Sequence, residues 1–98
     1  MADLDPVIHQ PARLQIMAAL AALREGDSVE FTFLRELLGL TDGNLGAHLR
    51  RLEEAGYLSV EKTFVDRKPR TFVSLSIEGR AAFERHVRAL EAILGRKR

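Results

Sequence analysis

Residues 34–58 read LRELLGLTDGNLGAHLRRLEEAGYL and contain two helical patterns separated by a short break. Gly39 stands where a helix C-terminal cap is expected, and Thr41 followed by Asp42 favours the start of a new helix. The first pattern begins at FLRELL, and we expect Thr32 to cap it through its hydroxyl group. A short helix, a tight turn and a longer helix in this order are typical of a helix-turn-helix.

The longer helix, expected over residues 41–55 and ended by Gly56, has two different sides. At 100° per residue, Leu45, Leu49 and Leu52 lie within about 60° of one another and form an apolar stripe. The opposite side and one flank are small, polar or basic, and consist of Gly43, Asn44, Ala47, His48, Arg50, Arg51 and Glu54. That composition suits a helix that enters a groove.

After Gly56 the apolar period changes from 3.6 to 2, which indicates strands over residues 57–64 and 71–77. The intervening VDRKPR, residues 65–70, contains three cations and Pro69, which we expect to set the turn. The sequence therefore predicts a β-hairpin with a basic loop made of Arg67, Lys68 and Arg70.

The rest of the chain supplies two long helices and a short strand. Pro11 opens an apolar helix over residues 11–24, which we interpret as a central core helix, and residues 28–31 form an edge strand. Ser76 caps a last helix over residues 77–94. In that helix apolar residues are spaced 4, 3 and 4 apart, as in a packing seam, and are Phe83, Val87, Leu90 and Leu94.

Composition excludes several classes of function. The chain has 98 residues, 46% hydrophobic and 30% charged, which predicts one globular domain over residues 1–98. It has no cysteine, and its three histidines form no ligand pair, so we expect neither a metal nor another cofactor. No membrane span, signal peptide or catalytic constellation is recognisable. We therefore expect a soluble, cytoplasmic protein that is not an enzyme.

Charge is distributed unevenly along the chain although the net charge is only +1. Residues 1–40 carry six acids and three bases, and residues 76–98 carry three acids and six bases. Local clusters of positive charge matter more for nucleic-acid binding than the total does.

Three stretches resemble the small winged-helix transcriptional regulators related to the MarR and ArsR families. They read L-T-x-G-N-L-x-x-H-L-x-x-L-E-x-x-G-Y from residue 40, R-K-P-R-T from residue 67 and L-S-x-x-G-R from residue 75. The opening P-x-R-L-x-I-M-x-x-L at residues 11–20 is similar as well. The resemblance implies an α+β, mainly α fold: a winged helix-turn-helix with a two-stranded wing and a C-terminal dimerisation helix.

The same resemblance implies a homodimer that binds double-stranded DNA. Helix 41–55 would lie in the major groove and wing 65–70 on the backbone or in the minor groove. The candidate DNA-binding residues are Thr41, Gly43, Asn44, Ala47, His48, Arg50, Arg51, Arg67, Lys68 and Arg70. Alternatives remain open: Asn44 suits adenine or phosphate, His48 suits DNA or a half-buried site bonded to backbone, and Arg50 and Arg51 suit DNA or pairing with Glu53 and Glu54.

The first and last helices together have more apolar surface than one core needs, so we expect them to form a two-fold interface. Its candidate residues are Leu14, Met17, Phe83, His86, Val87, Leu90, Ile93 and Leu94. The sequence thus predicts a dimeric, sequence-specific regulator, with repression as the family-like default. An effector is not identifiable. The competing hypothesis is a winged-helix protein-interaction module without DNA binding, which the near-neutral net charge and the acidic residues Glu53, Glu54 and Glu61 support.

Overall fold

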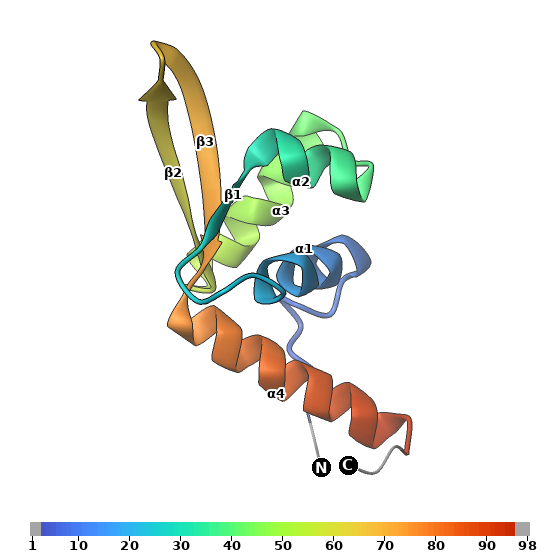
Figure 1. The fold of residues 1–98 in the computed structure, drawn as a ribbon. Helices are drawn as coiled ribbons and strands as arrows, with labels where there is room; N and C mark the ends of the chain where they lie inside the picture. Colours follow the sequence, from blue (N-terminus) through green and yellow to red (C-terminus); the bar gives the residue numbers. More distant parts are fainter. Residues whose placement is uncertain (1–2, 96–98) are drawn as a thin grey trace.

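The computed structural model describes residues 3–95 and contains four helices and one small sheet. In chain order the elements are α1 (Pro11–Ala21), β1 (Ser28–Glu30), α2 (Phe31–Leu38), α3 (Asp42–Glu54), β2 (Leu58–Val65), β3 (Lys68–Leu75) and α4 (Ile77–Ile93). The helices group together while the β2–β3 hairpin stands away beside α3 (Figure 1), giving extents of 50 × 25 × 22 Å. The predicted α+β, mainly helical winged-helix architecture is confirmed.

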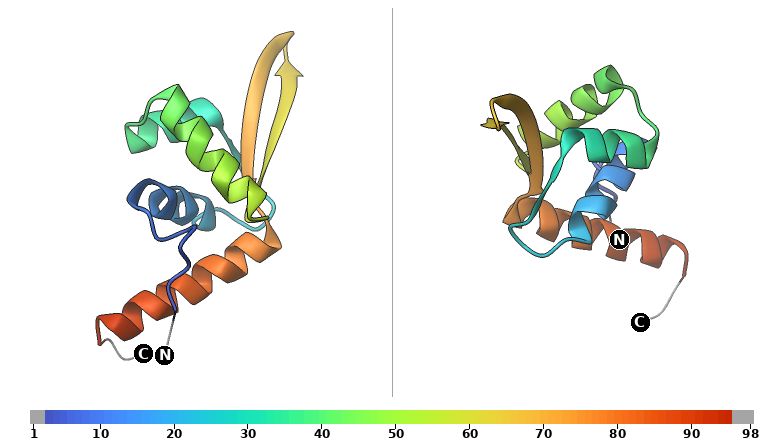
Figure 2. Two further views of the ribbon diagram at one scale, coloured as in Figure 1. Left: turned by 180° about the vertical axis from the view of Figure 1, so that it is seen from behind. Right: turned by 45° about the horizontal axis from the view of Figure 1, so that its top comes forward.

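The sheet is antiparallel with strand order β1-β3-β2. Strands β2 and β3 pair along their whole length, from Leu58 opposite Leu75 to Val65 opposite Lys68. β1 is the predicted edge strand and pairs only with residues 72–74 of β3. The outer half of the hairpin therefore projects as a two-stranded wing (Figure 2).

The hairpin turn differs from the prediction. It contains only Asp66 and Arg67, with φ of 51° and 65°, as in the tight turns that match the twist of paired strands. Pro69 does not set the turn; it lies in β3 opposite Phe64. Proline is tolerated there because β1 ends at Glu30 and leaves that part of β3 with an open edge.

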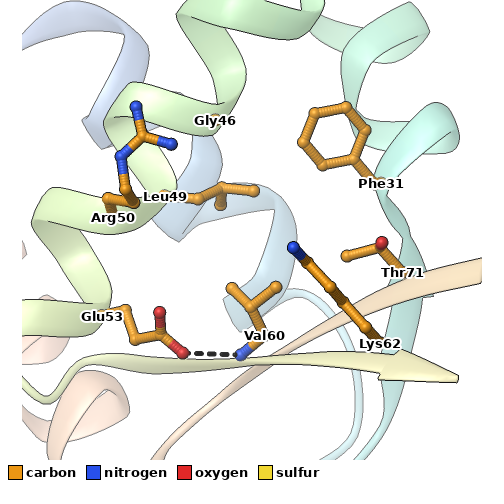
Figure 3. A pocket seen from close by; sticks show the side chains of 8 residues that line it. All are labelled: Phe31, Gly46, Leu49, Arg50, Glu53, Val60, Lys62 and Thr71. Carbon is orange, nitrogen blue, oxygen red and sulfur yellow. Dashed lines mark hydrogen bonds between the residues drawn. The ribbon is translucent and has the colours of Figure 1, made fainter.

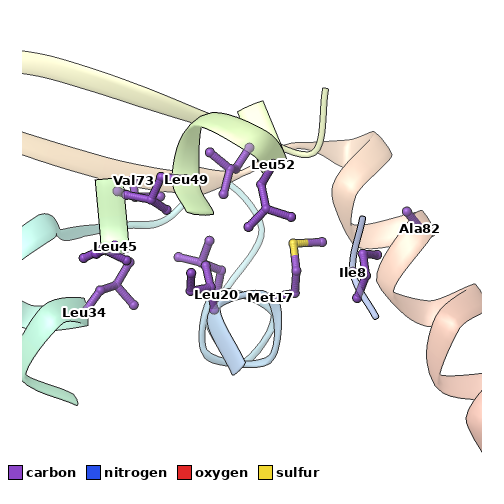
Figure 4. Close-up of a cluster of buried hydrophobic side chains, with 11 residues drawn as sticks. Ile8, Met17, Leu20, Leu34, Leu45, Leu49, Leu52, Val73 and Ala82 are labelled. Carbon is purple, nitrogen blue, oxygen red and sulfur yellow. The ribbon is translucent and has the colours of Figure 1, made fainter. Parts of the chain in front are cut away.

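Helix α1 is the centre of the core, as predicted. Its Met17 and Leu20 are buried against the leucine stripe of α3 and against Ile8 (Figure 4), and Ile16 is fully buried in the same cluster. The assignment of Met17 to a dimer interface is therefore wrong, because its own chain covers it completely. Leu45, Leu49 and Leu52 are buried as the helical period predicts.

Two helix boundaries also differ from the prediction. Helix α2 begins at Phe31 with Glu30 as its cap residue, so Thr32 already lies inside the first turn and does not cap it. Pairing of Glu30 with Phe72 holds the chain extended up to that point. Helix α1 ends at Ala21 rather than at residue 24. At this end of the helix, Arg80 donates hydrogen bonds to the carbonyl oxygens of Ala21 and Leu23.

Helix α4 begins as predicted at the Ser76 cap, whose Oγ accepts a hydrogen bond from the N–H of Gly79 at 2.9 Å. Ile77, which the predicted strand and the predicted helix both included, belongs to the helix and is exposed. The helix buries a stripe made of Gly79, Ala82, His86 and Ala89.

Residues 3–10 cross α4 on the way to α1 (Figure 1), and Asp5 and His9 lie against His86 of that helix. The Nδ1 of His86 accepts a hydrogen bond from the N–H of Asp5 at 3.0 Å, and the Asp5 carboxylate accepts one from the Tyr57 hydroxyl. His86 is only 1% exposed, so its assignment to a dimer interface is wrong. The N-terminal segment, and not a second subunit, covers this histidine.

Candidate nucleic-acid interface

The turn before α3 is fixed by two local interactions. The Thr41 hydroxyl accepts a hydrogen bond from the N–H of Asn44 at 3.1 Å, which confirms Thr41 as the helix cap. Gly39 ends α2 in the left-handed conformation at φ 65°, as predicted. Arg35 of α2 forms a 2.7 Å ion pair with Asp42, and this carboxylate raises the pKa of Arg35 through a hydrogen bond and its charge.

The face of α3 opposite the leucine stripe is open to solvent. Thr41, Gly43, Asn44, Ala47, Arg50 and Arg51 are all exposed. A β-carbon at Gly43 would meet nothing within 4 Å, so neighbouring side chains do not require a glycine there. Tight helix–helix packing therefore does not explain Gly43.

Arg50 and Arg51 are not neutralised on the helix. Within residues 3–95 neither of them forms an ion pair with Glu53 or Glu54. Glu53 instead accepts a hydrogen bond from the Val60 N–H at 3.2 Å, which attaches the end of α3 to β2. Both guanidinium groups are thus available to a phosphate or a base edge.

His48 is half-buried at the edge of this face. Its Nδ1 lies 3.3 Å from Nη1 of Arg13, so its partner is a side chain of α1 and not the backbone. Burial and then the charge of Arg13 lower the pKa of His48. The imidazole therefore links α3 to α1 and exposes only part of its ring.

The three cations predicted for the wing lie in three different environments. Arg67 lies at the tip of the turn in the left-handed region, which favours glycine or asparagine over a residue of this size. Lys68 begins β3 and is exposed. Arg70 is held by a 3.1 Å ion pair with Glu30, so it is a less available cation than the sequence suggests.

A hollow of about 440 Å³ separates α3 from the wing (Figure 3). Its lining is apolar at Phe31, Leu49 and Val60. Lys62 points from β2 towards α3, whereas the Arg50 side chain lies back along α3 towards Gly46 (Figure 3). Lys62 was missed in the sequence analysis because it lies in the strand pattern and outside the basic loop. Its position two residues after Val60 was the available signal, since alternation puts both on one side of β2.

The candidate dimer residues that stay accessible lie towards the end of α4. Ile93 and Leu94 are 61% and 68% exposed, whereas Phe83, Val87 and Leu90 are half-buried. Leu14 of α1 is half-buried as well. Leu14 and Phe83 pack partly against the core of their own chain, so Val87, Leu90, Ile93 and Leu94 are the predicted interface residues that remain most available.

Other kinds of site find no support in residues 3–95. No group of three or more histidine, aspartate or glutamate side chains could hold a metal ion there. No helix in this part of the chain combines the length and the apolar character that crossing a membrane requires.

Comparisons with known proteins agree with this geometry. A protein of Pyrococcus horikoshii described as a transcriptional regulator homologue superposes with a TM-score of 0.83 at 34% identity, covering 91% of this chain and 85% of that one. An uncharacterized protein of Methanocaldococcus jannaschii is 35% identical over 83% of this chain and 85% of its own length. NolR from Sinorhizobium fredii shares the fold with a TM-score of 0.63 at 20% identity, over 99% of this chain and 100% of that one.

The sequence profile of one family, described as a winged helix DNA-binding domain, matches residues 12–94. This family and this fold are those of transcriptional regulators and not of enzymes. The predicted resemblance to small winged-helix regulators is thereby confirmed. The chain belongs to the winged helix DNA-binding domain family.

Proposed function

We propose that this protein binds double-stranded DNA as a homodimer and represses transcription, with α3 in the major groove and the wing on the neighbouring backbone or minor groove. The observation that supports this proposal most directly is the exposed face of α3. It combines a glycine with open space around it, an exposed asparagine and two arginines without an ion pair in the described chain.

Each part of the interface has a separate task in this proposal. Arg50, Arg51 and Arg67 contact phosphates and supply most of the affinity, while Asn44 and Ala47 contact base edges and supply specificity. The N-terminus of α3 favours a phosphate, because its first N–H groups point outward and its dipole is positive there. Thr41 can add its hydroxyl group to the same phosphate.

The proposed dimer uses the outer side of α4. Its exposed Ile93 and Leu94 continue the line of half-buried Val87 and Leu90, so a second copy could cover an apolar strip along the helix. A two-fold arrangement would place two α3 helices on half-sites about 10–10.5 bp apart or a multiple of this. The operator would then be a pseudo-palindrome.

Selection from a random duplex library at about 150 mM salt tests the proposal, because weak phosphate-only binding is suppressed there. We expect enrichment of a pseudo-palindrome, and we expect Asn44→Ala to change which sequence is enriched. Sedimentation of the free protein tests the dimer, with Leu94→Glu as a surface variant that should release monomers. No enrichment from a folded dimer would contradict sequence-specific binding and favour a protein-interaction module. Repression is tested with the selected operator placed in a reporter promoter.

A further inference from the structure

The two sides of the wing differ in chemistry from base to tip. Alternation along β2 places Leu58, Val60, Lys62 and Phe64 on one side, which we call the inner side because Val60 and Lys62 face α3 across the hollow. Ser59, Glu61, Thr63 and Val65 lie on the other, outer side. The inner side changes from buried at Leu58 to half-buried at Val60 and exposed beyond it.

Phe64 is the outermost apolar residue of the inner side, and it has no role in the core. Its side chain is 72% exposed, the second-highest value among the exposed large hydrophobic residues of the described chain. Its cross-strand neighbour is Pro69, also exposed and on the same side. An aromatic ring and a proline ring thus form a small apolar pair near the tip of the wing.

Cations lie near this pair. Lys62 precedes Phe64 on the same side, Arg67 lies in the turn beside Asp66, and Lys68, opposite Val65, projects from the outer side. Apolar rings cannot pair with phosphates, but they pack against deoxyribose or unstacked base steps. A second copy of the wing is a less suitable partner, because its identical positive charges would repel the first. Charge complementarity therefore favours a polyanion that also offers apolar surface.

We propose that Phe64 and Pro69 form an apolar contact with the minor-groove sugars of the bound duplex, next to the half-site that α3 occupies. This inference rests on the proposed DNA binding and adds to it a contact that carries no charge. The minor groove is about 6 Å wide, which admits the edge of one aromatic ring but not a helix. The cations on either side would hold the two flanking phosphate strands.

The affinity for the selected duplex, measured from about 100 to 400 mM salt, separates this contact from the phosphate contacts. Phe64→Ala should lower the affinity about tenfold at every salt concentration and leave the slope of log K against log salt unchanged, because no counterion is involved. Phe64→Leu should restore most of the loss. Arg67→Ala should instead flatten the slope by about one.

Val65→Ala is the matched control, because Val65 is the adjacent exposed apolar residue, projects from the outer side and is not one of the proposed DNA contacts of the wing. It should leave affinity and slope unchanged. Hydroxyl-radical footprinting adds a positional readout, since these radicals cleave at minor-groove sugars. The wild-type protein and Val65→Ala should protect the sugars flanking the half-site, and Phe64→Ala should lose that protection.

The outcomes separate the two proposals. If wild-type protein selects no duplex, the proposed function fails and this inference fails with it. If wild-type protein and Arg67→Ala behave as expected while Phe64→Ala matches wild type, only the apolar contact is overturned. Equal losses for Phe64→Ala and Val65→Ala, or a lower sedimentation mass of Phe64→Ala without DNA, would also overturn it. Those results would indicate that Phe64 stabilises the hairpin or contacts another protein chain.

Discussion

Gly79, in the first turn of α4, lies directly against the backbone of Tyr57. A β-carbon at Gly79 would be 1.9 Å from the carbonyl oxygen of Tyr57 and 2.7 Å from its carbonyl carbon. The same carbonyl accepts a hydrogen bond from the N–H of Ser76 at 3.0 Å. The end of the α3–β2 connection and the start of α4 are therefore locked together at one point.

Gly79→Ala should destabilise the domain by at least about 2 kcal/mol, because backbone rather than a flexible side chain would have to move. Urea unfolding followed by circular dichroism measures the change in the free energy of unfolding. A loss below about 0.5 kcal/mol would mean that the contact is looser than described.

Gly43→Ala should have the opposite effect on stability, since the added methyl group meets nothing and alanine favours the helix. We expect a gain of a few tenths to about 1 kcal/mol, together with weaker binding to the selected duplex, where the methyl group would hold α3 away from the groove. The same unfolding assay and a titration with labelled duplex measure both effects. Unchanged DNA affinity would remove Gly43 from the proposed interface.

Arg67→Gly should separate stability from binding. The left-handed backbone at Arg67 costs about 1 kcal/mol relative to glycine, so the variant should be more stable by about that amount. It should also bind DNA more weakly and with a salt slope about one unit smaller, because a phosphate contact is lost. A variant that gains stability and keeps the full salt slope would show that the guanidinium makes no phosphate contact.

His86 should make the domain less stable below neutral pH. Burial, followed by the neighbouring charge of His9, lowers its pKa below the ordinary 6.5, while Asp5 acts in the opposite direction. The unfolded chain therefore binds a proton first as the pH falls below about 6.5, and stability decreases until the folded state is protonated too. Above about pH 6.5 the contribution of the uncharged His86 to the stability of the domain is fully present.

Denaturant midpoints at pH 7.5 and pH 5 measure this effect, with His86→Gln and His48→Gln as a pair. His86→Gln should reduce the pH dependence and leave the part that His48 contributes, since the pKa of His48 is lowered as well. The same dependence in wild type and in both variants would assign the acid sensitivity to other groups.

The helix-turn-helix was predictable because its signals are local. Thr41, Gly39 and the leucine stripe each act within one or two helical turns, and the structure confirms all three. The turn of the wing was misplaced for a different reason. Pro69 is a turn residue by composition, but its place in β3 depends on where β1 stops, which is a long-range property.

The prediction of the dimer-interface residues from sequence was limited in a similar way. Met17 and His86 lie on apolar helical stripes, and a stripe does not say whether its own chain or a partner covers it. The irregular segment 3–10 covers His86, and it has no periodic pattern that sequence analysis could recognise. Arg70 looked like a free cation because its partner, Glu30, lies 40 residues away in sequence.

The contacts of Asp5 and Ile8 show that the folded body includes residues before α1. Ile8 is fully buried and packs in the core, and Asp5 joins Tyr57 to His86. The family match starts only at residue 12, so a boundary drawn from sequence similarity would cut through the folded body and expose the centre of α4 to water. The folded body therefore extends further towards the N-terminus than the recognisable family, and truncated variants should keep residues 5–11.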